Sequence, residues 1–346
     1  PQTQELLKLA ACIGNKFNLN ILATIAERSP AETSQILWEA LQAESIVLLS
    51  ADVYCDREEL SNRQQKITYQ FLHDRVQQAA YELIPVDRRC EKHLQIGQLL
   101  LDRLSEEEQE SQVFEVVNQL NLGMPLITDP GDREELVQLN LRAGCKAQAS
   151  LSYQAAIGYL TAGIQLLASD SWTGNYELSL ALYEAAVRTA YLLGCYEQME
   201  ELAAVVLKCT PDRLDRIAVY ETKILAYGAQ NRAKEAVQLA LNVLQELGVE
   251  FPEEPTQADI GKALEETFAN LGDREIESLI DLPEMTDRQT IAVMRLLSSI
   301  MTLTYQVTPQ LFPLIVLRQV NLSLSIGNTE LSAFAYVAFG LILCGI

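Results

Sequence analysis

The chain has 346 residues, of which 49% are hydrophobic and 21% charged. This is enough apolar material for two or three globular domains, and too much for a disordered or fibrous chain. The net charge is −21, which repels the phosphates of nucleic acids and anionic membranes, so we expect no nucleic-acid partner. Seven basic and 11 acidic residues stand up to Pro85, and 19 and 36 follow it. This asymmetry predicts two units with a boundary at that residue.

The seven cysteines are odd in number and form no CxxC pair, which is typical of a reducing compartment and predicts a cytoplasmic protein. No signal peptide opens the chain, and the longest uncharged apolar stretch, from Leu331 to Ile346, is shorter than the roughly 20 residues of a membrane span. We therefore expect no membrane insertion. The chain begins at Pro1, and its last helical pattern still runs at Ile346. We expect a piece of a longer polypeptide.

Three short helices and two strands are predicted in residues 1–85. Apolar residues spaced three and four apart predict helices, and an apolar run and an alternating run predict strands. The helices cover Glu5–Ile13, Leu19–Glu27 and Ser34–Ala43, the strands cover Ile46–Leu49 and Ile67–Leu72, and a polar loop, Asp52–Lys66, joins the strands. This order predicts a small winged-helix domain. Its third helix contains Glu39 and no Lys or Arg, which favours protein interaction over DNA binding.

His73 stands where the second predicted strand ends and a helix begins, in the stretch FLHDRVQQAAYELI from Phe71 to Ile84. Asp74 can cap that helix, whose first turn offers free backbone N–H groups and the positive end of the helix dipole. Together with an imidazole, these groups suit a phosphate. In the alternative interpretation, His73 donates one hydrogen bond in the core and Asp74 only caps. The residues alone leave both interpretations open.

The FxHDRVQQAAY stretch, preceded by ACIGNKFNLNILATIAE and followed by helical pairs, resembles large bacterial signalling proteins. These proteins join a Ser/Thr protein kinase, a STAND-type AAA ATPase, a TPR-like region and a sensor histidine kinase, and the resemblance covers essentially the whole chain. It implies that His73 contacts the ADP β-phosphate in the resting state and that Asp74 caps the helix and orients His73. Leu72 stands where the family motif has methionine.

The resemblance places the bound ADP or ATP in the parent ATPase and implies no cofactor held by this segment alone. No GxxxxGK[ST] motif occurs in the chain, so we expect the phosphate loop upstream of Pro1. The implied partners are another protein, or the ATPase and kinase domains of the same polypeptide.

Residues 86–346 show the helical period throughout, with Gly and Pro between the segments. Twelve helices are predicted: Asp87–Leu104, Gln112–Leu122, Arg133–Ala149, Tyr153–Leu167, Tyr176–Leu193, Tyr196–Lys208, Asp212–Ala229, Ala233–Leu247, Gln257–Asn270, Asp287–Gln306, Gln310–Ser325 and Thr329–Gly345. Consecutive helices are expected to form six antiparallel pairs. The fold class is therefore mainly α, a winged helix followed by a TPR-like α-solenoid.

Similar segments begin at Tyr153, Tyr196 and Ala233, which are 43 and 37 residues apart and fall near the periods of helical-pair repeats. Small residues in these segments suit close packing between the helices of a pair. They are Ala156, Ala203 and Ala236. Gly194, Gly228 and Gly327 are expected to close helix ends.

Two further features are predicted to have no binding or catalytic role. The acidic residues between Glu106 and Glu110 indicate a solvated turn. His93 and Cys90 are expected on an exposed helix, without a third ligand at metal-binding spacing.

We find no kinase, histidine-kinase, GxSxG or HExxH motif and no paired carboxylates, so we expect no catalytic residue and no metal site. Together with the resemblance, which implies a multi-domain signalling kinase, these absences favour a non-catalytic regulatory and protein-interaction segment of such a kinase. It would couple the nucleotide state of an upstream ATPase to a helical-repeat sensor or scaffold. The alternatives are an architectural spacer between kinase modules and a stand-alone enzyme with an unrecognised site.

Overall fold

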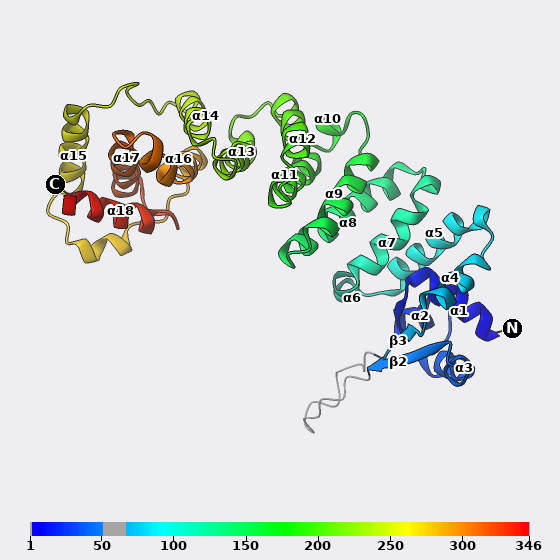
Figure 1. Cartoon of the computed structure of the whole chain (residues 1–346). Helices are drawn as coiled ribbons and strands as arrows, with labels where there is room; N and C mark the ends of the chain where they lie inside the picture. Colours follow the sequence, from blue (N-terminus) through cyan, green and yellow to red (C-terminus); the bar gives the residue numbers. More distant parts are fainter. Residues whose placement is uncertain (1, 51–66, 346) are drawn as a thin grey trace. The chain divides into compact units, whose positions relative to one another are not determined.

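The computed structural model describes residues 2–50 and 67–345. The chain is mainly α-helical and built from helical repeats, as predicted. It divides into two compact units, Pro1–Ala168 and Ser169–Ile346. Figure 1 labels the helices and strands of the chain. Residues 1–85 thus share their unit with the helices up to residue 168, whereas the sequence predicts a boundary at Pro85. The predicted loop Asp52–Lys66 lies outside the described residues.

The first unit opens with four helices and a small sheet. Its elements are α1 (Gln2–Ile13), β1 (Lys16–Asn18), α2 (Leu19–Ile25), α3 (Pro30–Gln42), β2 (Ile46–Ser50), β3 (Thr68–Phe71) and α4 (Asp74–Glu82). The strands form an antiparallel sheet in the order β1-β3-β2. All the predicted helices and strands of this segment are present.

Strand β1 was not predicted from the sequence. Its three residues carry one apolar side chain, Phe17, and are too few to show alternation. Phe17 is buried and lies against Tyr69 and Phe71 of β3, with ring centroids 5.8 and 5.5 Å apart. This aromatic packing fixes the strand in the sheet.

The rest of the first unit is helical. It contains α5 (Val86–Arg103), α6 (Glu106–Ser111), α7 (Val113–Gly123), the 3₁₀ turn η1 (Met124–Leu126), α8 (Pro130–Ala149) and α9 (Tyr153–Leu166). Helix α5 packs on α7 and α8 on α9, as the predicted pairs require. A Cβ at Gly123 would lie 2.8 Å from the Leu94 Cα, so glycine permits the close approach of α7 to α5. Helix α2 also packs on α5.

The acidic stretch from Glu106 to Glu110 is wrongly predicted as a turn. It forms helix α6, which Ser105 and Glu108 open with a reciprocal capping box. Carboxylates in a first turn stabilise a helix through its dipole, which explains the difference. Glu110 also pairs with Arg142 of α8 at 2.5 Å.

The second unit holds nine α-helices among its described residues. They are α10 (Ser171–Gly174), α11 (Tyr176–Leu192), α12 (Tyr196–Cys209), α13 (Ile217–Ala229), α14 (Ala233–Glu246), α15 (Gln257–Leu271), α16 (Arg288–Val307), α17 (Leu311–Ile326) and α18 (Ser332–Gly345), with the 3₁₀ turns η2 (Leu214–Arg216) and η3 (Ile276–Asp281). All twelve helices predicted after Pro85 are found. The predicted close-packing residues Ala156, Ala203 and Ala236 are fully buried in their two units.

One predicted pair, α15 with α16, does not form. Helix α15 packs on α17, and α16 packs on α13 and α14, so α15 stands outside the succession of pairs. The connection between α15 and α16 is long and contains η3. It is held beside the end of α17, where the Asn328 N–H donates to Pro283 O at 2.8 Å. Five of the six predicted pairs form.

Two of the three predicted glycine ends are correct, because Gly194 and Gly327 have positive φ angles of 74° and 135°. Gly228 lies inside α13, and Asn231 takes the left-handed position (φ 60°) in its place. Asparagine tolerates that conformation better than most residues. Within the described ranges, no helix is long and apolar enough to cross a membrane.

Candidate functional site

His73 lies at the corner between β3 and α4, exposed to solvent. It is the N-cap residue of α4, with an extended backbone (φ −138°, ψ 139°), and its side chain makes no capping hydrogen bond. The His73 carbonyl accepts hydrogen bonds from the N–H groups of Val76 and Gln77. Among the described residues, neither the imidazole nor the N–H groups of Asp74 and Arg75 have a hydrogen-bond partner.

The prediction that Asp74 caps the helix and orients His73 is wrong. Asp74 is the first residue inside the helix, so the capping position belongs to His73. The Asp74 carboxylate instead accepts a hydrogen bond from Asn15 Nδ2 at 2.9 Å, and no hydrogen bond joins it to the His73 ring. The Asn15 carbonyl also accepts from the Phe71 N–H at 3.0 Å. Asn15 therefore fixes the corner from the α1–β1 turn.

This geometry excludes the core alternative for His73, and the ligand interpretation stays a prediction. A side chain exposed to water donates no core hydrogen bond. The free first-turn N–H groups and the dipole of α4 attract an anion beside the imidazole. Arg75, exposed in the same turn, adds a positive charge.

The second histidine forms a buried chain of hydrogen bonds that was not predicted from the sequence. His93 on α5 is 3% exposed, so the expectation of an exposed helix face is wrong. Its Nδ1 lies 2.7 Å from Gln119 Oε1 on α7, and its Nε2 lies 3.0 Å from the Tyr81 hydroxyl on α4. Gln119 Nε2 donates to the Cys12 carbonyl of α1 at 2.9 Å.

The direction of these bonds follows from Gln119. Because its amide nitrogen faces Cys12, its oxygen faces the imidazole, so His93 Nδ1 carries a proton and donates it. Nε2 is then free to accept from Tyr81. Burial raises the pKa of Tyr81 and raises the pKa of the Cys12 thiol to about 11, so both stay protonated at neutral pH. We call this set Tyr81, His93, Gln119 and Cys12 the His93 chain.

A sequence signal for the His93 chain existed. His93 stands three and seven residues before Ile96 and Leu100, which are both buried in α5. A helix places residues at this spacing on one face, so His93 belongs to the apolar face. The His93 chain therefore joins α1 and α4, in residues 1–85, to α5 and α7, the first helical pair of the region that follows.

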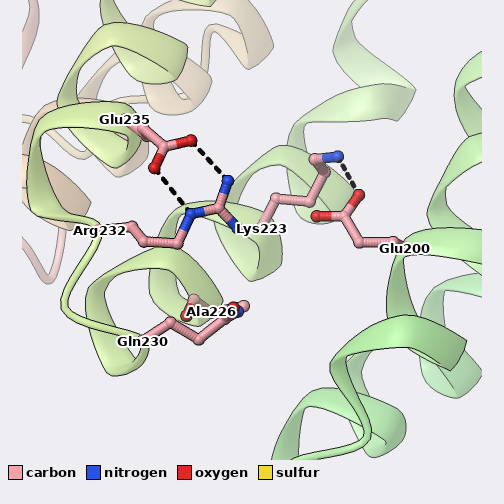
Figure 2. A network of polar contacts seen from close by, with 6 residues as sticks. All are labelled: Glu200, Lys223, Ala226, Gln230, Arg232 and Glu235. Carbon is pink, nitrogen blue, oxygen red and sulfur yellow. Dashed lines mark hydrogen bonds and ion pairs between the residues drawn. The ribbon is translucent and has the colours of Figure 1, made fainter.

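In the second unit, a set of polar contacts lies along three consecutive helices, α12, α13 and the start of α14 (Figure 2). Lys223 of α13 bonds Glu200 of α12, while Arg232 pairs with Glu235 at the start of α14 through bonds of 2.8 and 2.5 Å. The Arg232 guanidinium also lies 4.3 Å from the ring centroid of Tyr227. The Lys223–Glu200 pair therefore joins α12 to α13, whereas the Arg232–Glu235 pair is local to the start of α14, which reaches α13 through the contact of Arg232 with the Tyr227 ring.

A second cluster of charged side chains in the same unit contains a carboxylate without a paired cation in the described part of the chain. Glu221 of α13 pairs with Arg295 of α16, and Asp215 accepts from Arg288 at 3.0 Å. Glu184 of α11 has no hydrogen-bond or ion-pair partner among the described residues. Burial, followed by the charge of Asp215, raises the Glu184 pKa to about 7.

Nothing in the described ranges gathers three or more His, Cys, Asp or Glu side chains in a metal-binding arrangement. The described cysteines, Cys12, Cys90, Cys145, Cys195, Cys209 and Cys344, are free thiols.

The chain is similar to part of a known signalling protein. It is 25% identical over 294 residues to hybrid signal transduction histidine kinase G of Dictyostelium discoideum. The match covers 72% of this chain and 9% of the relative. No protein-family model matches the chain, and no solved structure matches it. The similarity supports a signal-transduction context for this chain.

Proposed function

We propose that the chain is a non-catalytic regulatory and protein-interaction segment of a multi-domain signalling kinase. In this proposal, residues 1–85 are a winged helix that closes on a nucleotide bound by an ATPase of the same polypeptide. The observation that carries it is the exposed His73 at the open first turn of α4. The similarity to a hybrid histidine kinase supports the signalling context.

The corner offers an ADP phosphate three kinds of donor. These are the His73 imidazole, the N–H groups of Asp74 and Arg75, and the Arg75 guanidinium. The Asp74 carboxylate opposes the phosphate charge, but its bond to Asn15 engages one of its oxygens. In this proposal, the His73 imidazole contacts the β-phosphate.

The helical repeats would receive the nucleotide signal through the His93 chain. Helix α4 carries both His73 at its start and Tyr81 near its end. Tyr81 is hydrogen-bonded to His93, which is hydrogen-bonded to Gln119 of α7. A shift of α4 between nucleotide states would change these buried bonds and bias the helical pair beside them.

An architectural spacer is the second candidate function. The network of Figure 2 favours it, because the Lys223–Glu200 ion pair joins α12 to α13, and the Arg232 cation is paired locally with Glu235. A spacer requires neither His73 nor nucleotide. The two candidates therefore differ in what His73 does.

The test measures ADP affinity in the full-length protein that contains this chain. Loss of a hydrogen bond to a charged group costs about 1.5–3 kcal/mol, so His73→Ala should weaken ADP binding about ten- to a hundredfold. Gln78→Ala, an exposed change one turn further along α4, is the control and should leave the affinity unchanged. Equal ADP affinity in wild type and His73→Ala would refute nucleotide sensing and favour the spacer.

A further inference from the structure

A half-open cavity of about 290 Å³ lies between α1 and the start of α5, away from His73. Helix α1 lines it with Glu5, Lys8 and Leu9, and α5 lines it with Arg88, Glu91, Lys92 and Gln95. Leu83, Ile84 and Pro85, in the connection between α4 and α5, close it. The volume is near the lower limit of small-molecule sites.

The charges in this cavity are unusual for so acidic a chain. Three of its lining residues are cations and two are carboxylates, whereas the whole chain carries −21. Lys8 is paired with Glu5 at 2.8 Å. The side chains of Arg88 and Lys92 have no hydrogen-bond or ion-pair partner in the described part of the chain.

Arg88 and Lys92 are one helical turn apart, so their like charges repel weakly, and a bound anion would relieve this repulsion. The N-cap of α5 is Pro85, which gives the helix no side-chain cap, and the carboxylate of Asp87 in the first turn offsets the positive potential of the first N–H groups, so the anion attraction rests on the two side-chain cations. Leu9 and Ile84 supply an apolar wall beside these charges. The cavity thus combines two free cations with an apolar surface.

We propose that this cavity binds a small organic anion. Its carboxylate or phosphate group would lie between Arg88 and Lys92, and its apolar body would lie against Leu9 and Ile84. Glu91 lines the same cavity and accepts a hydrogen bond from Gln95 at 3.3 Å. Its negative charge limits the affinity for the anion.

The probe is phenyl phosphate, titrated into the purified chain and followed by ligand-observed NMR or calorimetry. Inorganic phosphate carries the charge alone and benzyl alcohol the apolar ring alone. Phenyl phosphate should bind saturably, and at least about tenfold more tightly than either, because it engages both parts of the cavity. Non-saturable binding of phenyl phosphate, or equal binding of inorganic phosphate, would overturn the proposal.

Substitutions locate the site. Arg88→Ala and Lys92→Ala should each weaken phenyl phosphate about three- to tenfold, within the range for partly exposed charge-assisted bonds. Glu91→Gln should tighten binding about two- to threefold by removing a like charge. Lys262→Ala, an exposed cation of the second unit, is the matched control and should change nothing.

Unchanged affinity in the Arg88→Ala/Lys92→Ala double variant, with its circular dichroism spectrum intact, would place the anion elsewhere and overturn the proposal. His73→Ala separates this site from the proposed nucleotide contact. It should leave phenyl phosphate affinity unchanged, and a loss there would assign the probe to the His73 corner instead.

Discussion

Gln119→Leu is the substitution that tests the His93 chain most severely. Leucine has nearly the same volume as glutamine, so it creates no large cavity. It removes the acceptor of the His93 Nδ1–H and the donor to the Cys12 carbonyl, bonds of 2.7 and 2.9 Å. Both groups stay buried without their partner.

The magnitude follows from these two groups. A buried polar group left without a partner costs about 1–3 kcal/mol, so Gln119→Leu should lower the free energy of unfolding of the first unit by about 2–5 kcal/mol. Whole domains are stable by only about 5–15 kcal/mol. The variant should therefore open α5 and α7 far more often than wild type.

Hydrogen exchange followed by mass spectrometry resolves where the loss occurs. Peptides from α1, α4, α5 and α7 should exchange faster in Gln119→Leu, while peptides from α12 and α14 in the second unit should not change. Gln98→Leu, an exposed change on α5, is the control and should stay within about 0.5 kcal/mol of wild type. If α5 and α7 of Gln119→Leu exchange at the wild-type rates, a structural role for the His93 chain would be refuted.

Two more predictions concern the second unit. The pKa of Glu184 is about 7 in the folded chain, against an ordinary value of 4.5, so the folded state holds its proton more tightly, and stability should fall as pH rises from about 4.5 to 7. Glu184→Gln should remove this loss and stabilise the unit above that window by about 1–2 kcal/mol, after discounting for solvent screening. Urea unfolding on both sides of the window checks it, and parallel pH dependence in wild type and variant would contradict it. Gly327→Ala should destabilise the unit by about 2 kcal/mol or more, because φ is 135° and the new Cβ would lie 2.2 Å from Pro283 O. Gly340→Ala, where a Cβ meets open space, should be neutral or slightly stabilising in the same thermal unfolding experiment.

The long helices could be predicted because their apolar period extends over several turns. The twelve helices after Pro85 end within a few residues of their predicted limits, apart from α13, where η2 forms the predicted first turn. Strand β1 could not be predicted, because its single buried residue, Phe17, is fixed by rings from a distant strand. Likewise, nothing local to α15 indicates that it packs on α17.

The strand-to-helix corner that carries His73 was predicted in its position but not in its contacts, and its binding role stays a prediction. The strand-to-helix corner at His73 follows from local pattern, and the structure has it there. The partner of Asp74 is Asn15, 59 residues away, and only the folded chain brings them together. The His93 chain also joins distant residues, although the spacing of His93 from Ile96 and Leu100 already indicated a buried face.

The most direct test of the account measures hydrogen exchange in α7, residues 113–123, in the full-length protein with and without ADP. If nucleotide contacts His73 and the His93 chain transmits the change, ADP should alter protection of α7 in wild type. It should have no such effect in His73→Ala at matched ADP saturation. Identical exchange in wild-type α7 with and without bound ADP would contradict the proposed coupling between the corner and the helical repeats.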